Sequence, residues 1–550
     1  MQRIAALQLR NLVTPDWVTF ALLSATLLVV IRSVEAAGWA VHPPLSMTVL
    51  LAAFTGLLAA RLPWRAWQRH LAGAAMGLLV VYLQTASLVE AEGLARQFAQ
   101  LNDRLAAWWS AATGDGVNPD PLPFSLLLTV VAWAAGYLAA WVVFQSGNIW
   151  LAILPASLGL VTNLTYLPPS YVGYLFPFLL VTMLLLVRLT ALQRRASLGR
   201  SEIGYPSSLP HLSLGAAFVL SSLIVFAVAL LPDHSFRVEP LRRVWNASRQ
   251  PAEWVQEQFT RLFPGITGIK PSSASPFGAV FALIANAPTS EDTVFAANAP
   301  FATYWRVRSY STYTAGGWST GQTTIQPALQ LGVDLDLEIS DDPGTYYYEI
   351  QTHVPAPYLF LPSATPLSVN IPARLETLAK NEELAAMVAV RPQNPLEPKE
   401  TYNGLFTLAL PPEQLLREPT TEYPDWVLRQ YLQLPSSLPS RVRNEAASLT
   451  RGLDRSYDKA VAIEAFLREK LTYTANAPPA PAGADPIEHF LFEAREGHGG
   501  HFASAMTVML RSLGIPTRLV SGYGPGVPDE DEGVYLIRQK DRHYWPEAYF

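Results

Sequence analysis

Long apolar runs separated by short polar segments fill the first 232 residues of this chain, and the pattern changes after Pro232. A helix of about 20 apolar residues crosses the hydrocarbon core of a bilayer. We count about seven runs that reach or approach this length, and we therefore predict a multi-span α-helical membrane region over 1–232. The runs lie at 17–32, 44–60, 71–88, 124–145, 148–163, 171–189 and 212–231.

The charges between the runs predict the orientation of this region. Arginines lie before the first run and after the second and sixth runs, at Arg3, Arg10, Arg61, Arg65, Arg69, Arg194, Arg195 and Arg200. The alternate loops carry mostly acids, at Glu35, Glu90, Glu92, Asp103, Asp115 and Asp120. Because cytoplasmic loops are rich in Arg and Lys, we predict a multi-pass protein of the cytoplasmic membrane with a cytoplasmic N-terminus. Residues after about 232 are then extracytoplasmic, and the lipid bilayer is the first partner.

A transport path through the membrane region is an alternative function. Such paths carry ionisable side chains inside the membrane. The middle of each predicted run holds none, and Gln84, Pro155 and Pro177 are the polar or broken points. The pattern therefore favours an anchor for an outer domain, and a transporter with an outer domain remains an alternative.

Beyond Pro232 the periodicity indicates different elements. Apolar residues at helical spacing over 240–262, followed by a Gly-, Pro- and Ser-rich stretch at 264–275, predict an amphipathic connector and linker over 233–275. Short alternating segments such as 303–310 and 346–350 predict antiparallel strands and an extracytoplasmic β-rich domain over 276–412. Within it, Trp318 follows a Gly-Gly turn, which favours a packing role.

Residues 413–550 predict an α+β domain. Ser456 is the expected N-cap of one helix, and a short helix is expected at 486–494. A third helix is predicted from about 500 to 513 and ends before Gly514 and Pro516. Its expected buried stripe is Phe502, Met506, Met509, Leu510 and Leu513. Strands are predicted at 517–522, 534–538 and 543–550.

Composition limits the chemistry that this chain carries. Charged residues make up 15% of the chain and hydrophobic residues 50%, as in a membrane protein with a soluble part. The net charge of -5 gives no reason to expect a nucleic-acid partner. The chain has no cysteine, which excludes disulfides, thiolate metal sites and thiol catalysis.

The start of the third helix nevertheless has the layout of a thiol active site. The segment Gly497–Met506 places a helix N-terminus before a strand that carries His543 and Trp545. A helix N-terminus lowers the pKa of a thiol and holds an oxyanion, and a histidine on a neighbouring strand takes the thiol proton. The layout therefore predicts the surroundings of a cysteine nucleophile without the cysteine.

These segments resemble the transglutaminase-like superfamily, which has a papain-like fold. The family pattern is approximately G-x-C-x-x-F-A-S-A-M-x-x-x-L-R-x-x-G-I-P-x-R, followed by D-x-H-x-W-x-E. This chain matches it at Gly497, Phe502, Ala503, Ser504, Ala505, Met506, Leu510, Arg511, Gly514, Ile515, Pro516, Arg518, Asp541, His543, Trp545 and Glu547. The whole chain resembles bacterial membrane-anchored transglutaminase-like proteins. This resemblance implies acyl transfer or hydrolysis on protein or envelope peptide substrates outside the cytoplasm.

The chain departs from the family pattern at Gly499, which stands at the cysteine position. The resemblance therefore implies an impaired catalyst in which His543 is the base and Trp545 lines the cleft. In the family, the third triad residue is an Asp on the strand after the histidine strand. We expect this residue to be absent from the chain, whose last residue is Phe550, and we expect the transglutaminase-like domain to be truncated.

Neighbouring side chains do not supply a substitute. Ser504 lies more than one turn into the predicted helix. Asp541 lies two residues before His543 on one strand and would not reach across its ring. Arg511 and Arg518 are predicted to be structural or solvated.

His498, His501 and His543 form an alternative metal site, since three histidines suffice for zinc. The spacing of His498 and His501 is not a standard zinc pattern, so we place both at the cleft rim and predict no metal and no cofactor. The first hypothesis is an impaired family member that binds a peptide substrate, and a non-catalytic envelope binding or scaffolding protein is its alternative. An active enzyme follows only if codon 499 encodes cysteine. Transglutaminase and protease chemistry remain equally open.

Overall fold

The computed structural model describes residues 16–113, 117–118, 120–165, 167, 169–198, 209–229, 259, 262–263, 277–283, 289–314, 316–326, 344–378, 387–408, 411–418, 423–481 and 484–550. The chain divides into two compact units. Unit 1 comprises Met1–Ala106, Pro121–Gln250 and Ile266–Pro271, and unit 2 comprises Ala107–Asp120, Pro251–Gly265 and Ser272–Phe550. Most of the predicted connector at 240–262 and all of the predicted linker at 264–275 lie outside the described residues.

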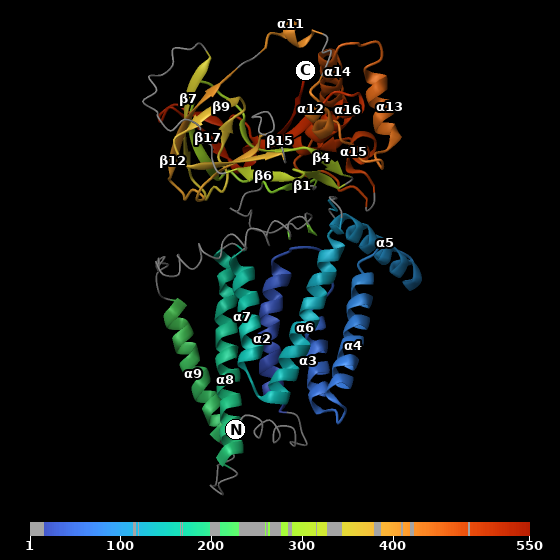
Figure 1. Ribbon diagram of the computed structural model, residues 1–550. Coiled ribbons are helices and arrows are strands. Elements are labelled where there is room, and N and C mark those ends of the chain that lie inside the picture. Colours follow the sequence, from blue (N-terminus) through green and yellow to red (C-terminus); the bar gives the residue numbers. More distant parts are fainter. Residues whose placement is uncertain are drawn as a thin grey trace. The chain divides into compact units, whose positions relative to one another are not determined.

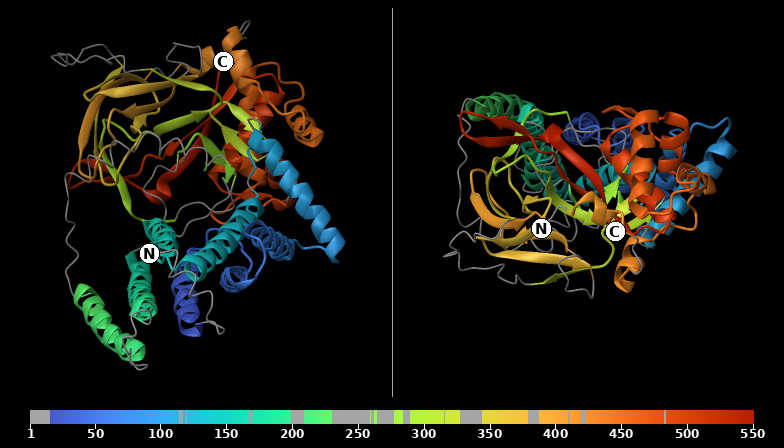
Figure 2. Two further views of the ribbon diagram at one scale, coloured as in Figure 1. Left: turned by 60° about the horizontal axis from the view of Figure 1, so that its bottom comes forward. Right: turned by 90° about the horizontal axis from the view of Figure 1, so that it is seen from above.

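Unit 1 consists of helices that follow the apolar runs (Figure 1, Figure 2). One further helix, α5, lies between the third and fourth runs and continues into unit 2. The described helices are α2 (Trp17–Ala36), α3 (Leu45–Arg61), α4 (Ala66–Ala86), α5 (Leu94–Thr113), α6 (Leu122–Ser146), α7 (Trp150–Thr165), η1 (Pro169–Tyr174), α8 (Leu175–Leu198) and α9 (Leu209–Ala229).

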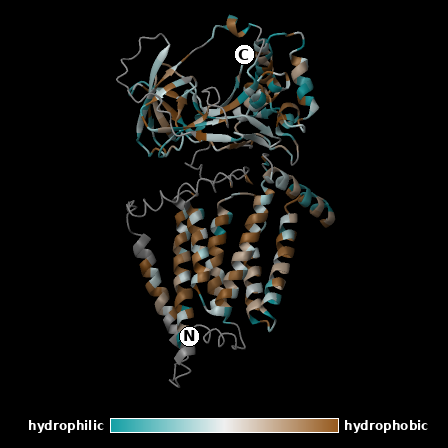
Figure 3. Ribbon diagram, viewed as in Figure 1, coloured by the Kyte–Doolittle hydropathy of each residue, from teal (hydrophilic) through white to brown (hydrophobic). Residues whose placement is uncertain are grey.

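Three stretches of unit 1 helix are long and apolar enough to cross a membrane: Trp17–Ala36, Leu122–Ser146 and Tyr171–Arg194. Shorter apolar helices lie at Leu45–Arg61, Trp150–Leu164 and Leu214–Ile224. Figure 3 shows the corresponding ribbons as mostly hydrophobic. An apolar helical N-terminal region is therefore confirmed, and the number of crossings stays a prediction.

Glycines let the helices of unit 1 approach closely. A Cβ added at Gly56 of α3 would overlap the carbonyl oxygen of Tyr137 in α6. On the facing helix, a Cβ added at Gly136 of α6 would lie 2.6 Å from the carbonyl oxygen of Val49 in α3. Gly73 of α4 faces the ring of Tyr137. Such close backbone packing stabilises helix association in lipid, where apolar side chains gain little by leaving the hydrocarbon.

Two features of unit 1 were not predicted. Helix α5 occupies a segment interpreted as a loop, where Phe98 stacks on Tyr82 with ring centroids 5.0 Å apart. Arg188 of α8 is buried and forms an ion pair with Asp16 before α2, with 3.0 Å between Nη2 and Oδ1. Arg188 lies at the end of the sixth predicted run, so the middle of that run remains uncharged.

Unit 2 contains strands from both predicted outer domains. They are β1 (Val280–Ala282), β2 (Thr293–Asn298), β3 (Trp305–Tyr310), β4 (Thr312–Thr314), β5 (Gly317–Ser319), β6 (Thr323–Gln326), β7 (Thr345–Thr352), β8 (Leu361–Pro362), β9 (Thr365–Val369), β10 (Ala373–Leu378), β11 (Met387–Pro392), β12 (Thr401–Thr407), β13 (Thr472–Tyr473), β14 (Glu496–Gly497), β15 (Thr517–Tyr523), β16 (Val527–Asp529), β17 (Val534–Arg538) and β18 (Arg542–Ala548). The helical elements are α11 (Glu413–Leu416), α12 (Asp425–Tyr431), α13 (Ser440–Leu449), α14 (Ser456–Lys470), α15 (Pro486–His489), η3 (Phe490–Ala494), α16 (Gly499–Ser512) and η4 (Gln539–Asp541).

The sheets of unit 2 combine strands from either side of residue 412. A four-stranded sheet has the order β18-β15-β3-β8, and a six-stranded sheet has the order β16-β17-β2-β7-β12-β9. In the first, β15 is antiparallel to β3, with Leu519 opposite Tyr310 and Tyr523 opposite Trp305. The boundary predicted at 412 therefore separates two stretches of sequence and not two sheets. Alternation predicts strands but does not identify their partners.

Local predictions for the last domain agree closely with the structure. α16 begins at Gly499, and β17 has the predicted bounds. β15 ends one residue later than predicted, and β18 begins one residue and ends two residues earlier than predicted. Gly514 has a φ of +80°, as expected for the residue after a helix end. Ser456 is the first residue of α14 rather than its N-cap, which is Arg455 without a side-chain cap.

α16 is buried on nearly all sides, whereas the prediction assumed one apolar stripe. Met509 and Leu510 are buried as predicted, but Phe502, Met506 and Leu513 are only partly buried. The fully or almost fully buried positions also include Ala503, Ser504, Ala505, Thr507 and Val508. The cause is that α16 contacts helices α13 and α14 as well as strands β15 and β18 (Figure 1).

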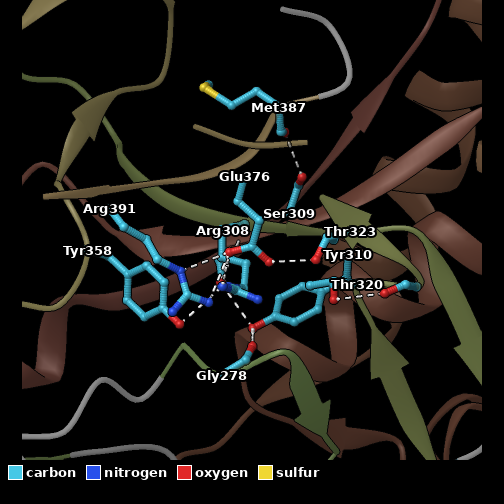
Figure 4. A network of polar contacts seen from close by, with 12 residues as sticks. Gly278, Arg308, Ser309, Tyr310, Thr320, Thr323, Tyr358, Glu376, Met387 and Arg391 are labelled. Carbon is cyan, nitrogen blue, oxygen red and sulfur yellow. Dashed lines mark hydrogen bonds and ion pairs between the residues drawn. The ribbon is translucent and has the colours of Figure 1, made fainter. Parts of the chain in front are cut away.

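A buried ionic network links β3 to β10 and β11 (Figure 4). Arg308 is fully buried and donates to Oε2 of Glu376 at 2.7 Å and to the hydroxyl of Tyr358 at 3.0 Å. Arg391 donates to the same glutamate oxygen at 3.1 Å, and Thr323 donates to the other at 3.1 Å. Because β10 and β11 belong to the sheet β11-β10-β6, the network connects that sheet to the four-stranded one.

Candidate functional site

The N-terminus of α16 is formed by His498 and two glycines. His498 is the N-cap, and its Nδ1 accepts a hydrogen bond from the backbone N–H of Gly500 at 3.1 Å. An imidazole nitrogen that accepts a hydrogen bond carries no proton, so in this arrangement Nδ1 of His498 is the acceptor nitrogen of the ring. The remaining N–H groups of the first turn give the helix start a partial positive charge.

Gly499 lies directly beside His543. An ideal Cβ built on Gly499 would be 3.7 Å from Nδ1 and 3.8 Å from Cε1 of the His543 ring, which are its nearest neighbours. Both distances are ordinary van der Waals contacts, so the position accommodates a side chain. One further atom on that Cβ would come within hydrogen-bond reach of the imidazole, as a nucleophile and its base require.

Gly500 differs from Gly499 in having no room for a side chain. Its added Cβ would lie 2.8 Å from Cζ of Phe281 and 2.8 Å from Cε1 of His498. Phe281 belongs to β1 and stacks on Tyr544 of β18, with ring centroids 4.4 Å apart. The space beside His543 is therefore specific to position 499.

His543 is held in the second position of β18, opposite Gly522 of β15. Its ring stacks on Tyr304, with centroids 5.2 Å apart and an angle of 14° between the planes. Burial lowers the pKa of His543 from its ordinary value. Desolvation disfavours the charged ring, so the imidazole is neutral near pH 7 and has the form that accepts a proton.

Trp545 and Glu547 follow His543 on the same face of β18. Trp545 lies opposite Val520 and donates from Nε1 to Oε1 of Glu547 at 3.2 Å. Arg306 of β3 and Arg518 of β15 both pair with Oε2 of Glu547, the latter from Nη2 at 2.7 Å. Burial alone would raise the pKa of Glu547, but Arg306 and Arg518 outweigh it and lower that pKa to about 2. Glu547 is therefore a charged anchor that orients Trp545.

Other residues considered from the sequence have structural contacts. Ser504 is fully buried and accepts a hydrogen bond from Nε1 of Trp318 at 2.9 Å, so its hydroxyl is directed into the core. Arg511 is buried and donates to the carbonyl oxygens of Thr517 and Ser311. Burial lowers the pKa of Arg511 to about 9. These contacts place Arg511 and Trp318 in the core, and place Arg518 beside Glu547 rather than in solvent.

The carboxylate of Asp541 is used within η4. Its Oδ2 accepts a hydrogen bond from the backbone N–H of Arg538 at 2.8 Å. Within the described part of the chain, no hydrogen bond joins a carboxylate to the His543 ring. The orienting third residue that the resemblance implies is therefore not supplied by Asp541.

The three histidines considered for zinc do not gather around one point. The rings of His498 and His501 are adjacent, with centroids 4.4 Å apart, whereas His543 lies against position 499. No group of three or more potential metal ligands occurs among the residues that the structure describes. His501 is buried, and burial, followed by the nearby His498 and His489, lowers its pKa to about 3. His498 and His501 are thus both buried rather than polar residues at the cleft rim, and the His501 ring is neutral.

Residues far away in the sequence complete the surroundings of His543. Tyr304 stacks on its ring, Arg306 holds Glu547, and Phe281 closes the space at Gly500. All three come from the segment interpreted as a separate β-rich domain. The alternating pattern of 303–310 predicted the strand that bears Arg306, but nothing in that pattern indicated that it pairs with β15.

Comparisons with known proteins find a family and several relatives that resemble parts of the chain. A family model described as the transglutaminase-like superfamily matches residues 443–550. The chain is 31% identical over 262 residues to YebA of Bacillus subtilis, covering 45% of this chain and 35% of YebA. It is 38% identical over 117 residues to the protein-glutamine gamma-glutamyltransferase of Pseudomonas aeruginosa strain PAO1, covering 21% of this chain and 17% of that protein. The chain thus spans well under two thirds of the length of either relative.

A solved structure also aligns with the chain. The crystal structure of the periplasmic domain of TgpA from Pseudomonas aeruginosa covers 50% of this chain and 91% of its own, at 21% identity and a TM-score of 0.39. The residues that match the family model include the helix start at Gly499 and the strand that bears His543 and Trp545. Residues 443–550 are therefore a domain of the transglutaminase-like superfamily.

Proposed function

We propose that this chain presents, outside the cytoplasm, a transglutaminase-like site that binds acyl groups of proteins or envelope peptides without turning them over. The observation that carries the proposal is the position of Gly499. A Cβ there would lie 3.7 Å from Nδ1 of His543, at an ordinary van der Waals distance. The surroundings of a nucleophile are thus retained around a residue that has no side chain.

The chemistry that is lost follows from the residue at 499. In the superfamily's acyl transfer, a thiolate attacks the carbonyl carbon and the histidine passes its proton to the leaving amine. Glycine offers no atom for that attack, and the chain contains no cysteine elsewhere. His543 retains the neutral form of a base but has no thiol to deprotonate.

The chemistry that remains is recognition of a carbonyl group. The partial positive charge at the start of α16 favours a carbonyl or carboxylate oxygen. Trp545 and Tyr304 provide aromatic surface next to His543, with ring centroids 5.3 Å apart. The name of the Pseudomonas aeruginosa relative supports the γ-carboxamide of a protein glutamine as the group bound.

Anchoring in the membrane supports the proposed location. Three helical stretches of unit 1 have the length and apolarity of a span, and the arginine pattern predicts that everything after about 232 is outside. The substrate or partner is then a protein or peptide of the cell envelope. A scaffolding role for the same site is the alternative, and it differs in requiring no recognition of the glutamine carboxamide.

Binding and turnover are measured separately in the full chain purified in detergent. A fluorescent peptide with one central glutamine is titrated for binding, and the same peptide with asparagine is the matched control. Incorporation of a fluorescent primary amine into the glutamine peptide reports turnover. We expect preferential binding of the glutamine peptide and no incorporation. Equal binding of both peptides would contradict glutamine recognition, and incorporation by the unaltered chain would contradict the loss of catalysis.

The proposed topology is tested with single cysteines, which are clean probes because the chain has none. Ser440→Cys places a thiol at the exposed first residue of α13, and Trp64→Cys places one in the exposed loop between α3 and α4. A membrane-impermeant maleimide added to intact cells is expected to label the first variant and not the second. Labelling of Trp64→Cys alone would show that the membrane region has the opposite orientation to the predicted one.

A further inference from the structure

We infer that Tyr304 is a positioning residue for His543, which fixes the imidazole so that Nδ1 faces position 499. This inference rests on the proposed function, because it assigns a role to Tyr304 in the same site. The evidence for it is the stacking of Tyr304 on the His543 ring and the position of Tyr304 directly before β3.

The contact is a parallel stack. The ring planes of Tyr304 and His543 differ by 14°, and their centroids are 5.2 Å apart. Tyr304 also contacts Trp545, at 5.3 Å and 33°, and the His543 and Trp545 rings differ by 20°. The tyrosine thus lies against two residues of one strand. Because the Tyr304 ring covers one face of the imidazole, the His543 side chain cannot rotate toward that face without displacing the tyrosine.

Tyr304 reaches His543 across β15, the strand that lies between β3 and β18. The residue of β15 opposite His543 is Gly522, which is also opposite Arg306. A Cβ at Gly522 would overlap the carbonyl oxygen of Trp305, so only glycine fits there. Gly522 thus lets β15 approach β3 closely and places no side chain between His543 and Arg306.

The backbone of Tyr304 is held independently of its ring. Its carbonyl oxygen accepts a hydrogen bond from the backbone N–H of Ser363 at 2.8 Å, and β3 begins at the next residue. The side chain itself is 42% exposed. A core residue would be buried, so the exposed ring contributes less to the fold than to the surface around His543. A stack on one face also keeps water from that face of the imidazole.

The test uses the full chain with Gly499→Cys, whose thiol is unique in this protein. The rate of alkylation by iodoacetamide is measured against pH, with Tyr304 unaltered, changed to Phe, or changed to Ala. Tyr347→Ala is the matched control, because Tyr347 lies on β7 with a similar exposure of 44%. The Phe variant keeps the flat ring, whereas the Ala variant removes it.

Tyr304→Ala is expected to lower the alkylation rate near neutral pH by between about tenfold and about a hundredfold, as misplacement of a reacting group does. Above about pH 10 the thiol is ionised without help, so the rates should converge there. Tyr304→Phe and Tyr347→Ala should behave as the parent. Equal rates for Tyr304→Ala and Tyr347→Ala at neutral pH would overturn the inference, as would an equal loss at all pH values.

A second readout does not need the introduced thiol. The His543 ring is titrated by NMR in the chain with Gly499 retained, before and after Tyr304→Ala. We expect the pKa of His543 to rise in the variant, because one face of the ring becomes hydrated. An unchanged pKa would contradict the inference. If the Gly499→Cys thiol proved no more reactive than the Ser440→Cys thiol, the proposed function would fail while this titration still decided the role of Tyr304.

Discussion

Strand β3 contributes one arginine to each of two clusters that share a composition and differ in their surroundings. In each cluster one glutamate lies between two arginines. The members are Arg308, Glu376 and Arg391 in one, and Arg306, Glu547 and Arg518 in the other. The Glu376 side chain is 3% exposed and connects two sheets, whereas the Glu547 side chain is 26% exposed and also binds Trp545.

The two clusters differ in what they connect to. Among the described residues, the Glu547 cluster reaches His543 through Trp545, whose ring contacts both Tyr304 and the His543 ring. The glutamate of the family pattern is thus a support for the aromatic residues and not a reacting group. Under the proposed function this support serves binding, since Gly499 has no side chain that could react.

The largest expected effect is on the more buried cluster. Glu376→Gln leaves Arg308 and Arg391 without a counter-charge, and Arg308 is fully buried. Breaking a buried pair in this way costs about 3–5 kcal/mol. Proteolysis of unit 2 at increasing urea concentration measures the loss, with the exposed Glu530→Ala as the control. Below the unfolding transition, Glu376→Gln should not change the reactivity of a Gly499→Cys thiol. A change would show that the Glu376 cluster also affects the site around His543.

Glu547→Gln should destabilise less and alter the site more. The glutamate is partly exposed, so loss of its charged hydrogen bonds to Arg306 and Arg518 should cost about 1.5–3 kcal/mol. Glutamine has one acceptor oxygen in place of two, so Trp545 must share it with Arg306 and Arg518, and the alkylation rate of a Gly499→Cys thiol near neutral pH should fall. Urea-dependent proteolysis and alkylation measure the two effects. A stability loss without any change in alkylation would contradict the proposed support of the site.

Acid should weaken the Glu547 cluster over a defined range. The pKa of Glu547 is about 2 in the folded chain, against an ordinary value of 4.5. A lowered carboxyl pKa contributes stability that is present above pH 4.5 and is lost as pH falls toward about 2. The unaltered chain should therefore lose stability over this range more steeply than Glu547→Gln does. Parallel pH dependences in the two proteins would show that Glu547 is not the titrating group.

The two glycines at the start of α16 give the smallest expected effects, with opposite signs. Gly500→Ala brings a Cβ within 2.8 Å of Phe281 and His498, and such overpacking should cost about 1 kcal/mol or more. Gly499→Ala has room, and replacing a helical glycine should add up to about 0.5–1 kcal/mol. Unfolding midpoints of the two variants measure the difference. A larger loss for Gly499→Ala would show that position 499 is not open.

The order of elements around the site followed from local patterns. The approximate bounds of α16, the bounds of β17 and the helix end at Gly514 are set by residues close in sequence. The proximity of His543 to Gly499 is a long-range contact, which was expected from the active-site layout and the family resemblance. Capping, periodicity and turn chemistry act over a few residues, so a single sequence contains them.

The contacts made by β3 did not follow from such patterns. Tyr304, Arg306 and Arg308 contact residues much later in the sequence, namely His543, Glu547 and Glu376. Strand alternation contains no information on which strands pair. The burial of α16 on nearly all sides was missed for a related reason. Ala503, Ser504 and Thr507 are buried because neighbouring elements cover them, not because they are strongly apolar.

The most direct test of the account is the pH dependence of alkylation of a single thiol at position 499. Gly499→Cys is compared with Gly499→Cys combined with His543→Ala, and with Ser440→Cys, which is also the first residue of a helix. We predict that the introduced thiol has an apparent pKa below about 7.5 in Gly499→Cys and nearer to about 8.5 in the other two proteins. Indistinguishable pH profiles for the three proteins would contradict the claim that His543 still serves a nucleophile position at Gly499.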